Sequence, residues 1–356
     1  MIKLHRRDFI RASIFGGIAA ASMPAFIMNA YGAQAKTTIE TNSRVALVIG
    51  SNRTEMVFNA LKPFAKEIAQ AAGNRRIIVK PNMVEKDIPL CATHKDTIEG
   101  ILEFFKSINK IDNVVIAESI AFGPANDCYE CYGYIPVAEK YKVKLLDLDE
   151  HPYRIHYVMD EADFIPKPIR VSALLADRNN FVMSSARLKT HGVVVATLSL
   201  KNLVLGCPLK DPGYFSHSVK NAKSGKQILH GNGYRAINYN IYSLAFHVRP
   251  DLAFVDGYEG MEGNGPTLGT PVDHRVCIAG LDWMSVERVG LELMGIDPAN
   301  VGYLKFCSES GMGQFDLNKI EIIGEQLANH IRTYKLHSSI EKQLQWMTAL
   351  KRNRES

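Results

Sequence analysis

The chain of 356 residues is 46% hydrophobic and 22% charged, the composition of a globular protein large enough for one domain or two lobes. Its formal net charge of +5 falls to about +2 once residues 1–35 are set aside, because those residues contribute about +3. Neither a basic stripe nor basic residues interleaved with aromatic ones stand out, which speaks against nucleic acid as a partner.

The N-terminus has the layout of an export signal. Arg6-Arg7-Asp8-Phe9-Ile10-Arg11 precedes a mildly apolar stretch at 12–28, and Ala33-Gln34-Ala35 offers a cleavage site. That stretch is shorter than the roughly 20 apolar residues that span a bilayer. We therefore expect residues 1–35 to be a twin-arginine signal peptide, recognised by the twin-arginine export machinery, and the protein to be periplasmic or otherwise exported. The alternative is an uncleaved amphipathic anchor. Because this route carries folded proteins, it favours a cofactor or metal loaded before export.

Apolar runs of strand length alternate with segments of helical spacing along the chain. One helix is expected directly after the first strand, and others near 127 and over 283–294. A further helix is expected to begin at Thr93, where Asp96 would complete a capping box. Strands are expected at 45–49, 76–79, 114–117, 144–148, 155–158, 181–184, 252–255, 276–279 and 320–323. This alternation predicts an α/β fold, with a mainly parallel sheet covered by helices on both faces. We expect the domain to cover 42–331, as one body or as two lobes around a cleft, followed by a polar helical tail at 332–356.

The six cysteines are scattered, and their spacing matches no zinc or iron–sulfur pattern. Only Cys128 and Cys131 are close together, and Tyr132 stands where a c-type haem site would have histidine. In an oxidising periplasm the pair could form a disulfide or a redox pair. The simpler interpretation is two small residues on a helix.

Polar residues cluster where the predicted strands end, and ligands of open α/β sheets bind beyond the carboxyl ends of the strands. Four groups stand out in chain order: Lys80 with Asn82, Glu118-Ser119, Lys189-Thr190-His191 followed by Thr197 to Asn202, and a glycine-rich acidic loop from Asp256 to Pro266.

If these groups converge, their residue types suit a small anion. Lys80, Lys189 and Lys201 would make a positive pocket for carboxylate or phosphate. Asn82, Asn202 and Asn264 would orient the ligand by hydrogen bonds. The alternative is that each lysine is merely solvated.

The same groups offer candidates for chemistry. His191, Lys189 and His94 are the expected catalytic residues, with an imidazole as acid, base or ligand. The carboxylates of Asp256, Glu259 and Glu262 would suit a hard or borderline divalent metal, which polarises a substrate or activates water. Alternatively, His94 is only an exposed or hydrogen-bonded side chain, and the segment from Gly263 to Pro266 is only a turn.

Together, the sequence segments around these groups resemble the family catalogued as domain of unknown function 362, over roughly residues 75–315. The pieces that match are Val79-Lys80-Pro81-Asn82-Met83, Ala92-Thr93-His94, Leu188-Lys189-Thr190-His191, Leu198-Ser-Leu-Lys201-Asn202-Leu203, Val255-Asp256-Gly257, Met261-Glu262-Gly263-Asn264-Gly265-Pro266 and Leu293-Met294-Gly295. The resemblance implies a protein that occurs alone or joined to ferredoxin-like iron–sulfur modules. This chain has no C-x-x-C-x-x-C run, so no ferredoxin-type cluster is expected in it. It also lacks the common nicotinamide and nucleotide motifs.

Three functions remain open. The preferred one is a metal-assisted enzyme, or a binder, that takes a small anionic substrate in a cleft lined by Lys, His and Glu. The second is a redox accessory protein associated with iron–sulfur chemistry, acting with a redox partner protein. The third is a non-catalytic periplasmic ligand-binding protein.

Overall fold

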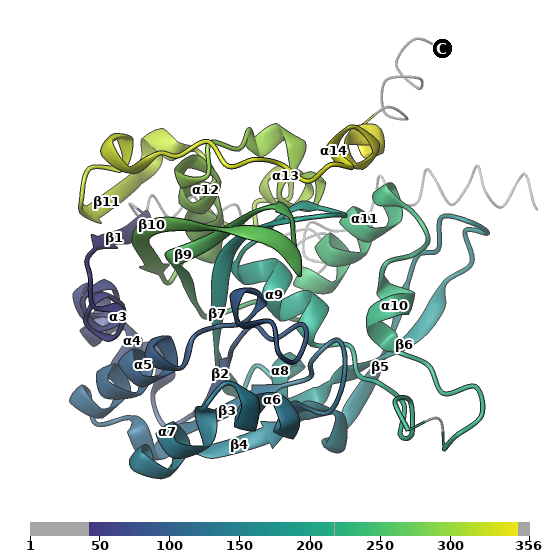
Figure 1. Ribbon diagram of the computed structural model, residues 1–356, viewed down its shortest axis with the longest axis horizontal. Helices are drawn as coiled ribbons and strands as arrows, with labels where there is room; N and C mark the ends of the chain where they lie inside the picture. The colour runs from purple at the N-terminus through teal and green to yellow at the C-terminus, as the bar shows by residue number, and fades with distance from the viewer. Residues whose placement is uncertain (1–42, 217, 348–356) are drawn as a thin grey trace, which may run out of the picture. The chain divides into compact units, whose positions relative to one another are not determined.

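A nine-stranded sheet forms the centre of the computed structural model, which describes residues 43–216 and 218–347 (Figure 1). The strand order is β11-β1-β10-β9-β7-β2-β3-β4, and the short β8 pairs with β7. The strands are β1 (Ser43–Ile49), β2 (Arg76–Lys80), β3 (Val114–Glu118), β4 (Lys144–Asp147), β7 (Asn180–His191), β8 (Val195–Thr197), β9 (Leu252–Asn264), β10 (Leu268–Gly280) and β11 (Ile320–Gly324). The predicted signal peptide lies outside the described residues.

Most neighbouring strands run parallel, which confirms the predicted fold class. Strands β4, β3, β2, β7 and β9 form successive parallel pairs, and β1 pairs parallel with β11. Strand β10 runs antiparallel to both β9 and β1. A separate hairpin consists of β5 (Tyr153–Val158) and β6 (Lys167–Ser172). Residues 43–347 belong to one compact unit, not to two lobes.

Helices cover both faces of the sheet, because successive residues of each central strand face opposite sides. Ile77 and Val79 of β2 join one apolar cluster, whereas Ile78 joins the other. The first cluster contains side chains of α3 (Arg53–Leu61), α4 (Ala65–Ala72), α5 (Lys95–Ser107), α6 (Ala125–Cys131) and α7 (Tyr134–Tyr141). The second contains those of α8 (Ala173–Ala176), α9 (Ser199–Gly206), α10 (Gly225–Leu229), α11 (Tyr234–Ala245), α12 (Trp283–Leu293) and α13 (Gly302–Glu309).

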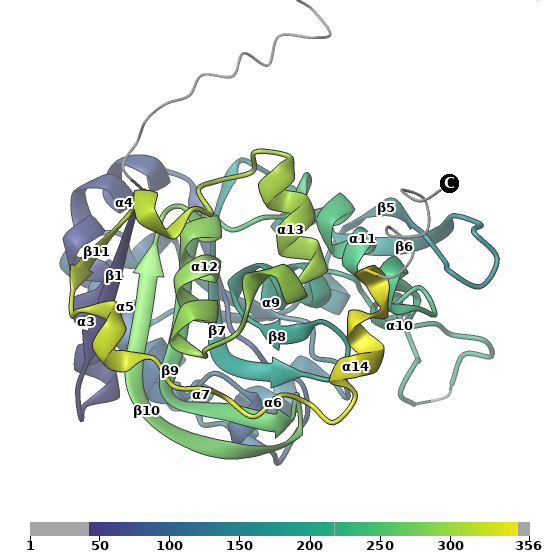
Figure 2. The ribbon, with the colours of Figure 1, turned by 90° about the horizontal axis from the view of Figure 1, so that it is seen from above.

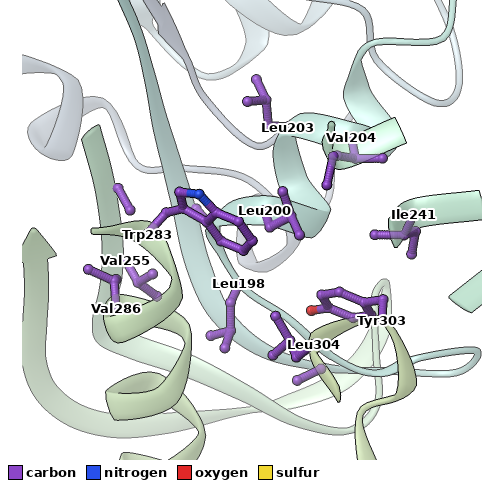
Figure 3. Close-up of a cluster of buried hydrophobic side chains, with 14 of the residues drawn as sticks. Leu198, Leu200, Leu203, Val204, Ile241, Val255, Trp283, Val286, Tyr303 and Leu304 are labelled. Atoms are coloured by element: carbon purple, nitrogen blue, oxygen red, sulfur yellow. The ribbon is translucent and has the colours of Figure 1, made fainter. Parts of the chain in front are cut away.

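The second cluster holds α9 in place. Figure 3 shows Leu200 and Val204 of α9 in the same cluster as Trp283 of α12, Tyr303 of α13 and Val255 of β9. All these side chains are buried. Because the apolar side of α9 is fixed in this way, the polar residues on its other side have fixed positions too.

The prediction of a glycine-rich acidic loop from Asp256 to Pro266 is wrong. Asp256 to Asn264 continue strand β9, which pairs with β10 up to Asn264 opposite Leu268. Strand β7 likewise runs on beyond Ser184 to His191. Backbone pairing with neighbouring strands satisfies the amide groups whatever the side chains are, so strands persist here through residues of low strand propensity.

Helix α5 is capped differently from the predicted capping box. His94 is its N-cap, and the His94 Nδ1 atom accepts a hydrogen bond from Asp96 N at 3.2 Å. The Thr93 hydroxyl instead accepts from Asn82 N and donates to Ser185 O. Thr93 therefore ties the segment after β2 to β7.

The segment after β11 runs along the end of the β9–β10 hairpin towards α14 (Ile340–Gln343) (Figure 2). Residues 331–337 have no regular secondary structure, and Tyr334 N donates to Met294 O while Gly263 N donates to Lys335 O. Gln343 and Trp346 are buried. Within its described part, the predicted helical tail is irregular up to residue 339 and helical over 340–347, and it packs onto the domain as a strap. No helix among the described residues is long and apolar enough to cross a membrane.

Candidate functional site

A pocket of about 300 Å³ opens at the carboxyl ends of β2 and β3, beside β7 and α9. Four lysines and a single carboxylate line it within the described part of the chain, together with two histidines and two asparagines. These residues are Lys80, Lys189, Lys201, Lys226, Glu118, His191, His230, Asn82 and Asn202. The structure therefore brings together six of the predicted site residues: Lys80, Asn82, Lys189, His191, Lys201 and Asn202.

Lys80 is fixed in the lining of this pocket by polar contacts. Its Nζ atom lies 2.8 Å from Glu118 Oε1 and donates to Asn202 Oδ1 at 3.2 Å. Asn82 Nδ2 donates to the same Asn202 oxygen at 3.0 Å. Asn82 Oδ1, by contrast, is buried and lacks a partner among the described residues. A ligand with a hydrogen-bond donor would satisfy this oxygen.

Gly206 makes room for the Lys80 side chain. A Cβ atom at position 206 would lie 1.9 Å from Lys80 Cε and 2.3 Å from Lys80 Nζ. The last residue of α9 therefore has to be glycine for the lysine to reach Glu118.

The other three lysines are buried without a carboxylate partner among residues 43–216 and 218–347. Lys189 Nζ donates to Cys91 O at 2.8 Å, Lys226 Nζ donates to backbone carbonyls such as Pro208 O, and Lys201 Nζ contacts Thr197 Oγ1 at 3.2 Å. Burial lowers the pKa of Lys189 and of Lys226 to about 7. It also lowers the pKa of Lys201 well below its ordinary value, with the charge of Lys189 as the next cause.

The two histidines of the pocket are held in opposite tautomers. His191 Nδ1 accepts from Val193 N at 3.1 Å, so a neutral His191 carries its proton on Nε2. His230 Nδ1 lies 2.7 Å from Lys226 O and must donate to it, so Nε2 keeps a free lone pair. Burial is the main cause that lowers the pKa of both imidazoles. One histidine thus offers a donor at Nε2 and the other an acceptor.

A second ion pair adjoins the pocket. Lys210 Nζ lies 2.5 Å from Asp149 Oδ2 and donates to Ile120 O at 2.7 Å. Asp149 also accepts from Ser119 Oγ. Sequence reasoning missed Lys210, Asp149 and Lys226 as site residues. Lys210 and Lys226 lie outside the predicted strands and their immediate neighbours, whereas Asp149 directly follows the predicted strand 144–148 and was overlooked. It noted Glu118 without giving it a role and did not place His230 in the site.

Two predicted residues lie beside the C-terminal strap, away from the pocket lining. Glu262 Oε2 accepts from Lys335 N at 2.9 Å, and Asn264 Oδ1 accepts from Ser338 N at 3.1 Å. Both side chains therefore hold the strap to the β9–β10 hairpin.

His94, Asp256 and Glu259 also lie outside the pocket lining, next to two arginines. Asp256 pairs with Arg53 at 3.2 Å, and Glu259 approaches Arg187 at 3.4 Å. Burial, followed by the charge of Arg53, lowers the pKa of His94. Within the described ranges, no group of three His, Cys, Asp or Glu side chains is spaced to hold a metal ion.

The cysteines are free thiols in the structure. Cys128 is buried on α6, and burial raises its pKa to about 12. Cys131 is exposed, and its Sγ atom donates to Asp87 Oδ1 at 3.1 Å. The buried Cys128 thiol is therefore protonated at neutral pH.

The family model described as "Domain of unknown function (DUF362)" matches residues 77–292 of the chain, which is more than half of it. The chain belongs to the DUF362 family. The match runs from β2 to α12 and includes every residue that lines the pocket. The pocket is thus part of the DUF362 domain itself.

The DUF362 protein is also similar to a thylakoid-associated protein of Synechocystis sp. (strain ATCC 27184 / PCC 6803 / Kazusa). The two are 24% identical over 228 residues, which are 64% of this chain and 65% of the relative. The chain thus spans slightly less than two thirds of that protein's length.

Proposed function

We propose that this DUF362 protein binds a small compound carrying carboxylate or phosphate groups in the pocket between β2, β3, β7 and α9. The single observation that carries the proposal is the excess of buried lysines over carboxylates in the lining. A buried ammonium group without a counter-charge is costly, and such groups respond with a lowered pKa. An anionic ligand would supply the missing charge to Lys189, Lys201 and Lys226.

The other features of the pocket agree with such a ligand. Its volume of about 300 Å³ is at the small end of the range for small-molecule sites. Asn82 Oδ1 and His230 Nε2 would accept hydrogen bonds from a ligand, while His191 Nε2–H would donate one. The site therefore offers charge together with directional contacts.

Metal assistance and redox function stay predictions. Among the described residues, Asp256, Glu259 and Glu262 contact Arg53, Arg187 and the strap, respectively, and none of the three lines the pocket. The proposal therefore rests on the anion alone.

We also propose that the protein acts after export, on the strength of the twin-arginine sequence in residues 1–35. The thylakoid association named for the relative agrees with a location linked to membranes. Replacing Arg6 and Arg7 by lysine should keep the protein in the cytoplasm. Equal export of wild type and variant would contradict this proposal.

Thermal unfolding with added phosphate, citrate or malonate tests the anion pocket. A ligand that binds only the native state stabilises it by about 2.7 kcal/mol at a concentration 100 times its Kd. We expect at least one of these anions to raise Tm in a saturable way, and no response to any of them would contradict the proposal.

Lysine variants distinguish the pocket from non-specific ion effects. Lys189→Met and Lys201→Met each remove a buried amine, so both should be more stable than wild type without ligand and should lose the response to the anion. Lys66→Met, which changes an exposed lysine of α4, is the matched control and should keep the response. An identical response in all three variants would place the binding elsewhere.

A further inference from the structure

Lys201 differs from the other lysines of the pocket in its partners. Lys80 has the Glu118 carboxylate, while Lys189 and Lys226 have backbone carbonyls. In the described part of the chain, Lys201 Nζ makes a single hydrogen bond, to the Thr197 hydroxyl. A hydroxyl can donate to a neutral amine as readily as it accepts from an ammonium. The surroundings of Lys201 therefore permit the neutral form, which has a nucleophilic lone pair.

The backbone around Lys201 is held rigidly. Helix α9 begins at Ser199, and the N–H of Leu200 donates to Glu287 Oε1 at 2.7 Å. Glu287 comes from α12 and is fully buried. The carboxyl group thus fixes the first turn of α9, in which Lys201 lies, and a fixed nucleophile needs less ordering when its substrate arrives.

Both pocket histidines lie within electrostatic range of Lys201. The charge of Lys201 is the second cause, after burial, that lowers the pKa of His191, and it also lowers the pKa of His230. Because of their tautomers, His191 presents Nε2–H and His230 presents an Nε2 lone pair. An amine, a hydrogen-bond donor and a proton acceptor therefore share one small cavity.

We propose that Lys201 forms an imine with a small anionic carbonyl compound, such as a 2-oxo acid, whose carboxylate is held by Lys189 and Lys226. This inference rests on the proposed anion pocket and adds to it a reaction and a class of substrate. Neutral lysines in apolar pockets are the usual amines of such chemistry.

The step balances without any other reactant. The Lys201 nitrogen attacks the carbonyl carbon, and the electron pair of the C=O bond moves to oxygen, where His191 Nε2–H donates a hydrogen bond. His230 Nε2 takes one proton from the nitrogen and returns it to that oxygen, which gives a neutral carbinolamine. The nitrogen lone pair then forms the second C–N bond as the hydroxyl leaves. The remaining N–H proton passes through His230 to the leaving oxygen, so the products are an imine and one water molecule.

Reduction with borohydride traps an imine as a stable secondary amine, which tests the proposal directly. Full-length protein would be incubated with glyoxylate or pyruvate at neutral pH, reduced, digested and mapped by mass spectrometry. We expect one adduct per chain, on Lys201. Propanal, a carbonyl compound without a carboxylate, is the matched probe and should give much less adduct at the same concentration. Adduct spread over exposed lysines, or equal labelling by propanal, would overturn the proposal.

Two variants separate chemistry from binding. Lys201→Arg places a permanent positive charge at this position but cannot form an imine, so it should lose the adduct while malonate still raises its Tm. Lys66→Arg should label like wild type. Adduct formation that survives Lys201→Arg would overturn the assignment of the nucleophile.

The trapping and Tm measurements together distinguish failure of the imine proposal from failure of the anion-pocket proposal. If malonate stabilises the wild-type protein but neither 2-oxo acid is trapped, the imine is wrong and anion binding stands. If malonate has no effect and no adduct forms, both are wrong.

Discussion

Lys80 Nζ lies 2.8 Å from Glu118 Oε1, and both side chains are only 1% exposed. The two residues are the last of the neighbouring parallel strands β2 and β3, so the pair joins the ends of these strands within the pocket lining. Asn202 accepts from the same ammonium and links the pair to α9. The positions of two lining residues of the pocket thus depend on a buried salt bridge.

Removing one member of this pair should be strongly destabilising. Glu118→Gln leaves the Lys80 ammonium buried without its counter-charge, and breaking a buried pair in this way typically costs about 3–5 kcal/mol. Urea unfolding of wild type and variant would measure the loss. Glu309→Gln, which breaks the exposed pair of Lys305 and Glu309, is the control and should change little. The double variant Lys80→Met with Glu118→Leu should recover much of the stability. If Glu118→Gln unfolds like the control, the pair has no structural role.

Gly206→Ala should disturb Lys80 without touching any charge. The added methyl group would lie 1.9 Å from Lys80 Cε, so the lysine has to move away from its contacts with Glu118 and Asn202. We expect a loss of about 1–3 kcal/mol in the free energy of unfolding, as for other overpacked sites, together with weaker anion binding. In Gly290→Ala, the new Cβ atom stays 3.1 Å from its nearest neighbour, Leu198 Cδ2, so this control should lose less. Unchanged anion affinity in Gly206→Ala would show that Lys80 does not shape the pocket.

The buried lysines predict how stability and binding depend on pH. Lys189 has a pKa of about 7 in the folded protein and an ordinary value of 10.5, so between these pH values the unfolded chain holds a proton that the folded chain lacks. Stability therefore rises with pH in this window. The advantage of Lys189→Met over ligand-free wild type should shrink as the pH is raised from 7 towards 10.5 in urea unfolding experiments.

Anion affinity should change in the opposite direction. Binding of an anion is favoured by protonated lysines, so the Kd measured by calorimetry should increase as the pH is raised through about 7. A Kd that stays constant over this range would argue against contact between the anion and Lys189 or Lys226.

Glu287 predicts a second pH effect of opposite sign. Burial raises its pKa from 4.5 to about 8, so between these values the folded protein holds a proton that the unfolded chain has lost. The resulting contribution to the free energy of unfolding is fully present below pH 4.5 and disappears as the pH rises through about 8. Glu287→Gln lacks the titration and keeps an acceptor for Leu200 N, so its stability relative to wild type should increase over this range.

Glu287→Leu tests the hydrogen bond instead of the charge. It leaves the N–H of Leu200 without its acceptor, and an unsatisfied buried group costs about 1–3 kcal/mol. We expect this variant to unfold at lower urea than Glu287→Gln at every pH. Equal stability of the two variants would show that Glu287 does not anchor α9.

The fold could be predicted because buried strands leave a clear pattern. Runs such as 76–79 and 114–117 are strands in the structure. The residues at or just after the ends of these strands meet at one edge of the sheet, and they are Lys80, Asn82 and Glu118. A parallel arrangement places the carboxyl ends of neighbouring strands together, so this part of the pocket follows from order along the chain.

The rest of the site could not be predicted from periodicity. Lys210 lies in irregular chain, and Lys226 lies on the short α10, so no strand end marked them as neighbours of Lys80. Asp256 and Glu259 look like loop residues because glycines surround them, yet pairing with β10 keeps them in a strand and directs them to arginines. Pairing with a neighbouring strand decides the backbone conformation at such positions, and the local sequence does not reveal that pairing.

The strap reaches the pocket wall through Gln343. Its Nε2 atom donates to His191 O at 3.0 Å, and its Oε1 atom accepts from Val195 N at 2.7 Å. During translation, β7 and α9 leave the ribosome long before residue 343 does. Until that glutamine is made, the turn that carries His191 lacks two of its hydrogen bonds. We therefore expect the anion binding proposed for this pocket to be complete only after residue 343 has been made.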